Sequence, residues 1–247
     1  MSKKDIVLSV EDLTVSFDGF KAVDDLSFYV DEGEIRVIIG PNGAGKTTVL
    51  DLICGKTKAT SGSIKFHDLE LTKLKEHEIV EAGVGRKFQN PSIYEALSVF
   101  ENLELSYPKG KRVFGALFFK RTDEVINKVK EIARMIYLDD MLDVKASLLS
   151  HGQKQWLEIG MLLIQNPKLL MLDEPVAGMS VAEREKTAEL LKNITKNRSV
   201  IVIEHDMKFV EHIADRVTVL HQGKFLAEGS MQSIQKNQKV IDVYLGQ

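Results

Sequence analysis

The sequence predicts an α/β fold with a parallel sheet at its centre. Continuous apolar runs occur at residues 35–39, 169–172, 200–203 and 217–220, and segments with helical periodicity separate them. Because these runs are continuous rather than alternating, they indicate strands covered on both faces, as in a parallel sheet with crossover helices. The chain has 247 residues, of which 44% are hydrophobic, and this suffices for one large domain with a sub-domain.

Two other parts of the chain are predicted to accompany this sheet. Segments 6–17, 26–30 and 62–66 are rich in Val, Ile, Phe and Thr and are bounded by Asp-Gly or Gly-containing turns, which predicts a small N-terminal antiparallel sheet. Residues 122–136 carry apolar side chains at helical spacing, within a region from about 91 to 166 whose whole pattern is helical. We therefore expect a helical sub-domain inserted into the sheet domain.

The expected organisation is a single domain over residues 1–247. Residues 1–90 and 167–230 are predicted to form its core with the antiparallel sub-domain. Residues 91–166 are predicted to form the helical sub-domain, and residues 231–247 a C-terminal helix.

Composition excludes several classes of protein. The net charge of −3 shows no basic excess, so no nucleic-acid partner is expected. The single cysteine, Cys54, excludes an internal disulfide framework, and we expect it to be a buried structural thiol. No window approaches eighteen apolar residues and the start lacks a long apolar core, so we expect the chain neither to be secreted nor to span a membrane by itself.

Residues 40–47 read Gly-Pro-Asn-Gly-Ala-Gly-Lys-Thr, a complete G-x-x-x-x-G-K-T phosphate-binding loop. The loop follows the apolar run at 35–39 and precedes a helical pattern that stops at Gly55, which is the context that this motif requires. Its glycines allow consecutive backbone N–H groups to surround phosphate oxygens. The sequence thus predicts a nucleoside-triphosphate site. The predicted binding residues are Gly40, Pro41, Asn42, Gly43, Ala44, Gly45, Lys46, Thr47 and Thr48.

Two side chains of the loop have predicted roles of their own. Lys46 is expected to bridge the β- and γ-phosphates, and the Thr47 hydroxyl to supply one ligand to Mg²⁺. The N-terminus of the following helix adds partial positive charge at the same place.

An apolar run that ends in Asp173-Glu174 predicts the second half of the catalytic centre. Buried parallel strands deliver their C-terminal residues to the ligand crevice of such a sheet. Asp173 is therefore expected to bind Mg²⁺, directly or through water, and Glu174 to accept a proton from the water that attacks the γ-phosphate. His205 follows the next apolar run and is expected to contact the γ-phosphate and to fix the geometry of Glu174.

Residues 149–153 read Leu-Ser-His-Gly-Gln and open a helix. Ser150 and Gln153 have the spacing of a capping box, and a helix N-terminus with small residues is also an anion site, so the two interpretations are compatible. Gln89 is predicted to lie where the sheet domain passes to the helical insert, a place where a polar amide is usually a loop residue.

Together and in this order, these motifs resemble the ATP-binding subunits of ABC transporters over essentially the whole chain. The resemblance implies a P-loop NTPase fold with a RecA-like core, with ATP and Mg²⁺ as cofactors. It implies that Phe17 stacks on adenine, that Gln89 joins Mg²⁺ and water to a membrane-domain interface, and that Glu174, His205 and Lys46 are catalytic. It also implies a head-to-tail pair of subunits, with each ATP lying between the phosphate loop of one and the signature of the other. The signature is residues 149–153, of which Ser150, His151, Gly152 and Gln153 are the implied nucleotide-binding residues.

The chain departs from the family pattern at two positions. His151 stands where the signature usually has Gly, and Ser180 stands where an Asp is common. Because His151 retains the backbone N–H that binds phosphate, we expect the site to function. The larger side chain is expected to affect dimer packing or the rate of hydrolysis.

The sequence of residues 16–22, 149–161 and 175–179 resembles that of the D-type ATP-binding subunits of urea importers. These importers belong to the branched-chain amino-acid class. This resemblance implies an ATPase for urea import on the cytoplasmic face of the membrane. The implied partners are a second ATPase subunit, in a heterodimer or a homodimer, two permease subunits and, indirectly, an extracytoplasmic binding protein. The alternatives are an importer of branched-chain amino acids or short amides, an ABC ATPase with a soluble partner, and a regulatory nucleotide-binding subunit.

Overall fold

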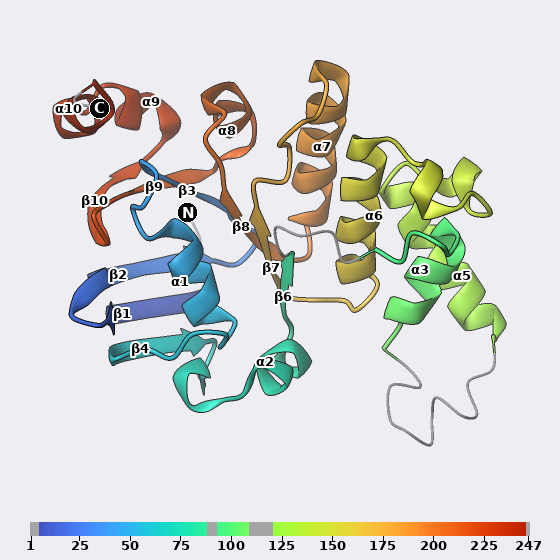
Figure 1. Cartoon of the computed structure of the whole chain (residues 1–247), viewed down its shortest axis with the longest axis horizontal. Coiled ribbons are helices and arrows are strands. Elements are labelled where there is room, and N and C mark those ends of the chain that lie inside the picture. The colour runs from blue at the N-terminus through green and yellow to red at the C-terminus, as the bar shows by residue number, and fades with distance from the viewer. Residues whose placement is uncertain (1–4, 88–92, 109–120, 246–247) are drawn as a thin grey trace. The chain divides into compact units, whose positions relative to one another are not determined.

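The structure of the chain is a computed structural model, which describes residues 5–87, 93–108 and 121–245. Its internal contacts divide it into two compact units. The first unit comprises Met1–Arg86, Lys168–Pro175 and Leu191–Gln247, and the second comprises Lys87–Pro167 and Val176–Leu190. Figure 1 shows the helices and strands of both units.

A six-stranded sheet with the order β10-β9-β3-β8-β7-β6 is the main layer of the first unit. Its strands are β3 (Ile35–Ile39), β6 (Val84–Lys87), β7 (Leu169–Asp173), β8 (Ser199–Ile203), β9 (Arg216–His221) and β10 (Lys224–Gly229). The pairs β9/β3, β3/β8 and β8/β7 are parallel, whereas β10 is antiparallel to β9. Every residue of β3, β7 and β8 is buried, and all but Arg36, Asp173 and Ser199 are apolar, as expected of strands covered on both faces. The predicted parallel-sheet core is confirmed.

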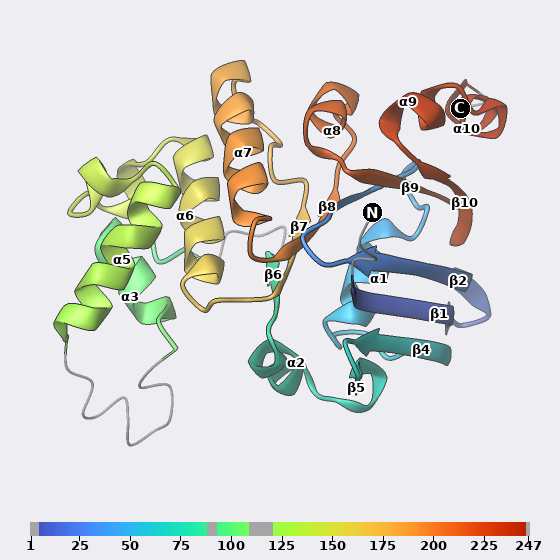
Figure 2. The same ribbon diagram turned by 180° about the vertical axis from the view of Figure 1, so that it is seen from behind.

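A second sheet in the same unit is antiparallel and has the order β2-β1-β4-β5 (Figure 2). Its strands are β1 (Ile6–Phe17), β2 (Phe20–Asp31), β4 (Ser61–Phe66) and β5 (Leu69–Glu70). Asp18 and Gly19 join β1 to β2 with φ angles of 49° and 88°, the left-handed values that a tight hairpin turn requires. The predicted antiparallel sheet is confirmed, although β2 begins six residues before the predicted run at 26–30.

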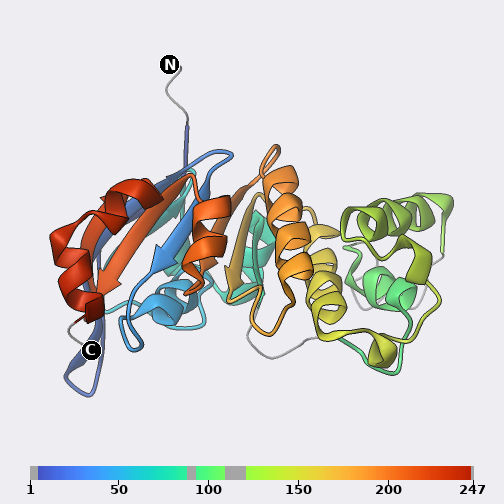
Figure 3. The same cartoon turned by 90° about the horizontal axis from the view of Figure 1, so that it is seen from above.

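The helices of the first unit include two short ones at its C-terminal end. The unit contains α1 (Lys46–Ile53), the 3₁₀ turn Leu71–Lys73, α2 (Glu76–Ala82), α8 (Met207–Ile213), α9 (Met231–Gln235) and α10 (Gln238–Leu245). Figure 3 shows α9 and α10 beside β10, against which both pack. The prediction of one continuous C-terminal helix is wrong. Asn237 interrupts it because its side-chain Oδ1 accepts the backbone N–H of Lys239 at 3.0 Å and so starts a new helix.

The second unit is helical. It contains α3 (Val99–Ser106), α5 (Asp123–Met135), the 3₁₀ turns Asp139–Met141 and Ala146–Leu148, α6 (His151–Leu163) and the first turns of α7 (Val181–Ile194). Helices α3, α5 and α6 pack on one another. Gly160 of α6 permits this approach, because a Cβ there would lie 2.5 Å from Ile136 Cδ1.

Of the helices that the structure describes, none is long and apolar enough to cross a membrane.

A buried charge network joins the two sheets of the first unit. Arg36 of β3 is fully buried, and its Nε donates to Glu34 Oε1 at 2.8 Å. Its Nη1 donates to Thr218 Oγ1 at 2.9 Å and to Glu228, and its Nη2 donates to the Tyr29 carbonyl at 2.5 Å. A buried cation is tolerated only when it is paired and hydrogen-bonded in this way.

We predict that Arg36→Ala lowers the free energy of unfolding by about 3–5 kcal/mol, because it leaves the buried Glu34 carboxylate with the more distant Arg216, at 3.9 Å, in place of Arg36 at 2.8 Å. Lys21→Ala is the matched control, since Lys21 forms an ion pair with Asp24 but is 55% exposed, and its loss should cost at most about 1 kcal/mol. Urea unfolding of the two variants measures the difference. Equal losses would contradict a structural role for the network.

Candidate functional site

The phosphate loop lies between β3 and α1 in a conformation that requires glycine. Gly40, Gly43 and Gly45 have φ angles of 157°, 77° and 93°. A Cβ at Gly40 would lie 2.3 Å from the Leu220 carbonyl oxygen, and one at Gly45 would lie 2.5 Å from that of Ala22. The loop is therefore fixed by close approach to neighbouring backbone as well as by its own torsion angles.

Lys46 faces the inside of the loop. Its Nζ donates to the carbonyls of Gly40 and Pro41, at 2.8 and 3.0 Å. Burial lowers the pKa of Lys46, while Glu174 and Asp173 act in the opposite direction. The ammonium group is thus held at the loop, within the field of the predicted metal ligand Asp173 and the predicted base Glu174.

Asp173 and Thr47 meet at the start of α1. Thr47 Oγ1 donates to Asp173 Oδ2 at 3.1 Å, and the other oxygen, Oδ1, is buried without a hydrogen-bond partner. Burial raises the pKa of Asp173, partly offset by the Thr47 hydrogen bond. A buried carboxylate oxygen that lacks a partner, beside a hydroxyl, fits a hard divalent cation that takes its remaining ligands from water and phosphate. Within the described ranges, no cluster of three or more His, Cys, Asp or Glu is suited to hold a metal without such help.

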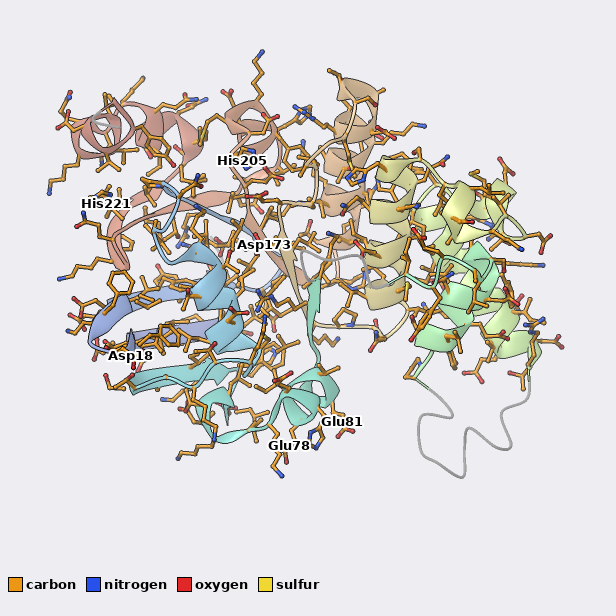
Figure 4. The ribbon with its side chains drawn as sticks, in the orientation of Figure 1. Asp18, Glu78, Glu81, Asp173, His205 and His221 are labelled. Atoms are coloured by element: carbon orange, nitrogen blue, oxygen red, sulfur yellow. The ribbon has the colours of Figure 1, made fainter. Side chains whose placement is uncertain are left out.

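Glu174 and His205 lie next to each other beyond β7 and β8. His205 Nδ1 is 3.4 Å from Glu174 Oε1, and both side chains reach solvent, with exposures of 67% and 40%. Glu174 has a φ of 48°, and its backbone N–H donates to the Ile203 carbonyl at 2.9 Å. This backbone bond fixes the turn that separates the direction of Glu174 from that of Asp173. Figure 4 labels Asp173 and His205, which come from neighbouring strands of the sheet.

In the second unit, α6 begins with the predicted capping box. Ser150 Oγ accepts the backbone N–H of Gln153 at 3.2 Å, and the Gln153 side chain accepts that of Ser150 at 2.8 Å. The ring of His151 is 3.0 Å from the Ala177 carbonyl through Nε2. Ser150 also donates its hydroxyl to Glu183 Oε1 at 3.1 Å.

The predicted site residues thus form two groups. Residues 40–48, Asp173, Glu174 and His205 belong to the first unit, where the contacts above link them, and Phe17 is half-exposed at the end of β1 in that unit. Residues 150–153 belong to the second unit. Gln89 lies outside the described residues.

Comparison with known proteins places the chain in a family. The model of the family described as "ABC transporter" matches residues 23–177, which include the phosphate loop, the 149–153 motif and the Asp173-Glu174 pair. The chain belongs to the ABC transporter family.

Curated relatives match this ABC ATPase along nearly its whole length. A high-affinity branched-chain amino acid transport ATP-binding protein, LivG of Escherichia coli K12, is 35% identical over 98% of both chains. BraF of Pseudomonas aeruginosa, which has the same description, is 34% identical over 98% of both. A probable branched-chain amino acid transport ATP-binding protein LivG of Archaeoglobus fulgidus is 33% identical, covering 97% of this chain and 95% of the relative.

Solved structures agree. The ADP conformation of MJ1267, an ATP-binding cassette of an ABC transporter, has a TM-score of 0.87 at 31% identity and covers 98% of this chain and 100% of its own. The predicted ABC ATPase fold is confirmed, as is the identity of the chain as an ATP-hydrolysing subunit of an ABC transporter. The names of the relatives support the branched-chain amino-acid alternative more than urea.

Sequence reasoning missed two basic residues of this ABC ATPase. Arg86 donates to Asp51 Oδ1 at 2.5 Å, and its charge opposes the rise in the pKa of Asp173. Lys87, in the second unit, forms a buried ion pair with Glu158 of α6 at 3.2 Å. Because basic residues are usually exposed, only their place in a short strand ahead of the insert could have indicated burial.

We predict that Asp173→Asn stabilises the nucleotide-free protein by ~0.5–2 kcal/mol at pH 7 while weakening Mg²⁺-dependent nucleotide binding. The raised pKa means that the folded chain disfavours the ionised Asp173 carboxylate relative to the unfolded chain, in which the pKa of the carboxyl is 3.8. The penalty is therefore absent below pH 3.8, grows as the pH rises from 3.8 to the raised pKa of the folded state, and stays constant above that pKa. Thermal unfolding of both proteins from acid to neutral pH measures this. A variant that is less stable at pH 7 would contradict the burial argument.

Proposed function

We propose that this ABC ATPase hydrolyses ATP at the edge of the sheet where β3, β7 and β8 end, and that the reaction powers the import of a small solute. The observation that carries the proposal is the Thr47–Asp173 contact with its unpartnered carboxylate oxygen, which lies beside the phosphate loop. Glu174 and His205 lie next to this contact and are proposed to activate the attacking water.

In the proposed complex, the loop N–H groups and the dipole of α1 bind the β- and γ-phosphates of ATP. Lys46 leaves the Gly40 and Pro41 carbonyls and pairs with phosphate oxygens, exchanging neutral acceptors for charged ones. Thr47 and Asp173 would hold Mg²⁺, with Gln89 as a further proposed ligand, and the ion would neutralise charge on the phosphates. Phe17, half-exposed at the end of β1, is proposed to stack on adenine.

Glu174 is the proposed general base. Its carboxylate reaches solvent and so can accept a proton from a water in line with the γ-phosphate. His205, 3.4 Å away, would hold that carboxylate in position and place its ring toward the γ-phosphate. Charge stabilisation by Lys46 and the loop would then lower the barrier to phosphoryl transfer.

The signature residues 150–153 are proposed to complete the site of a second ATPase subunit. Their N-terminal position on α6 presents backbone N–H groups and the Ser150 hydroxyl to a phosphate. ATP would therefore close two subunits together and hydrolysis would let them open. The proposed second subunit is a different ATPase chain, in a heterodimer, and the alternative is a second copy of this chain.

The proposed solute is a branched-chain amino acid, as the names of the relatives state for those proteins. Urea and short amides are the competing solutes. The proposed partners are two permease subunits and, indirectly, an extracytoplasmic binding protein, which place the chain peripherally on the cytoplasmic face of the membrane.

We predict that Glu174→Gln binds ATP but lowers turnover by at least about a hundredfold, the lower range for loss of a general base, and accumulates an ATP-bound dimer. Lys46→Ala, as the comparison variant, should lose ATP binding itself. Phosphate release and sedimentation of the two variants measure these effects. Unchanged turnover in Glu174→Gln would remove Glu174 from the role of base.

We also predict that a strain lacking this chain loses uptake of labelled leucine and regains it when the native chain, but not Lys46→Ala, is restored. Uptake of labelled urea in the same strain is the matched measurement. Loss of urea uptake with intact leucine uptake would overturn the proposed solute and favour urea.

A further inference from the structure

The carboxylate of Glu183 lies over the first turn of the signature helix α6. Its Oε1 accepts the Ser150 hydroxyl at 3.1 Å. A Cβ at Gly152 would lie 2.3 Å from the same oxygen, so the absence of a side chain at Gly152 makes room for the carboxylate. An acidic group of this chain thus already occupies the start of a helix that the proposed function assigns to phosphate.

The other oxygen of Glu183 is held by Ser180. The Ser180 backbone N–H and hydroxyl donate to Oε2 at 2.9 and 2.8 Å, and the Glu183 N–H donates back to the Ser180 hydroxyl at 3.3 Å. This is a capping box at the N-terminus of α7. An aspartate at position 180, which is common in the family, would place a second carboxylate against Glu183. Ser180 instead donates its hydroxyl to Glu183, which an ionised aspartate could not do.

His151, at the start of α6, also contacts the segment that precedes α7. Its ring contacts the Ala177 carbonyl at 3.0 Å and lies over Gly178, whose φ is 72° and where a Cβ would be 3.2 Å from the ring. The two departures from the family pattern, His151 and Ser180, thus both serve to attach the start of α6 to residues 177–183.

Glu183 is charged at neutral pH. The backbone N–H and the hydroxyl of Ser180 lower the pKa of Glu183, and burial opposes them less strongly. Its charge is therefore present when a nucleotide arrives.

We propose that Glu183 is a positioning residue that holds the Ser150 hydroxyl and opposes, by its charge, the γ-phosphate of an ATP carried by the partner subunit. The inference rests on the proposed function, in which Ser150 binds that phosphate. Closing of the two-subunit site then requires the Ser150 hydroxyl to exchange the carboxylate of Glu183 for the phosphate. This exchange raises the ATP concentration needed for closure and keeps the resting pair open.

The test uses the full chain in the Glu174→Gln background, alone and mixed with the second ATPase subunit of its transporter. Glu183→Gln keeps an oxygen that can accept the Ser180 N–H but removes the charge. We expect the ATP concentration for half-maximal assembly, measured by sedimentation, to fall roughly three- to tenfold, the size of a partly screened charge interaction. The difference should shrink as salt rises from roughly 0.05 to 0.5 M, which a purely structural effect would not do.

Glu185→Gln, which removes an exposed charge two residues further along α7, is the matched control and should shift assembly little. Glu183→Ala provides a second removal of the charge if Glu183→Gln folds poorly, and thermal unfolding shows whether each variant is folded. If the parent assembles and neither Glu183 variant shifts the ATP concentration for half-maximal assembly, the proposed role of Glu183 is wrong but the two-subunit site is not. Failure of the parent to assemble with ATP would overturn the two-subunit site of the proposed function, and this inference with it.

Discussion

The site depends on one constraint, the parallel register of three buried strands. Ile38 of β3 pairs with Ile203 of β8, and Ile203 pairs with Asp173 of β7. The three strands therefore end at the same level, and the segments that follow them, the phosphate loop, the Glu174 turn and His205, emerge side by side. A shift in the β8/β7 register would move Asp173 away from Thr47. The parallel pairing of β3, β8 and β7 thus brings the three motifs together in one site.

Much of this arrangement could be predicted from the sequence, because fully buried strands have continuous apolar runs and the phosphate loop has a fixed spacing. The parallel core, the antiparallel sheet, the capping box at Ser150 and the proximity of His205 to Glu174 follow from such local signals. The break at Asn237 was missed because one polar residue between two helical stretches gives little signal. The burial of Arg86, Lys87 and Arg36 was missed because pairing partners such as Asp51, Glu158 and Glu228 are distant in sequence. Long-range electrostatics of this kind cannot be read from periodicity.

The two departures from the family pattern gain a physical meaning from the structure. From sequence alone, His151 and Ser180 were isolated exceptions with an expected effect on packing or rate. In the structure they belong to one set of contacts, in which Ser180 holds Glu183, Glu183 holds Ser150, and His151 contacts the Ala177 carbonyl. In the proposal, the Glu183 carboxylate of the same subunit and the phosphate of the partner's ATP compete for the Ser150 hydroxyl. Small electrostatic changes at Glu183 should therefore alter when the subunits close rather than how fast phosphate is transferred once they have.

In the proposed function, one chain supplies halves of two different ATP sites. The measurement is amide hydrogen exchange with and without saturating ATP, in the isolated chain kept dilute enough to stay monomeric and in the assembled transporter. We expect ATP to slow exchange of residues 40–48 in both samples, but to slow exchange of residues 150–153 only in the assembly. Protection of residues 150–153 by ATP in the monomer, or its absence in the assembly, would show that the chain does not divide its residues between two sites in this way.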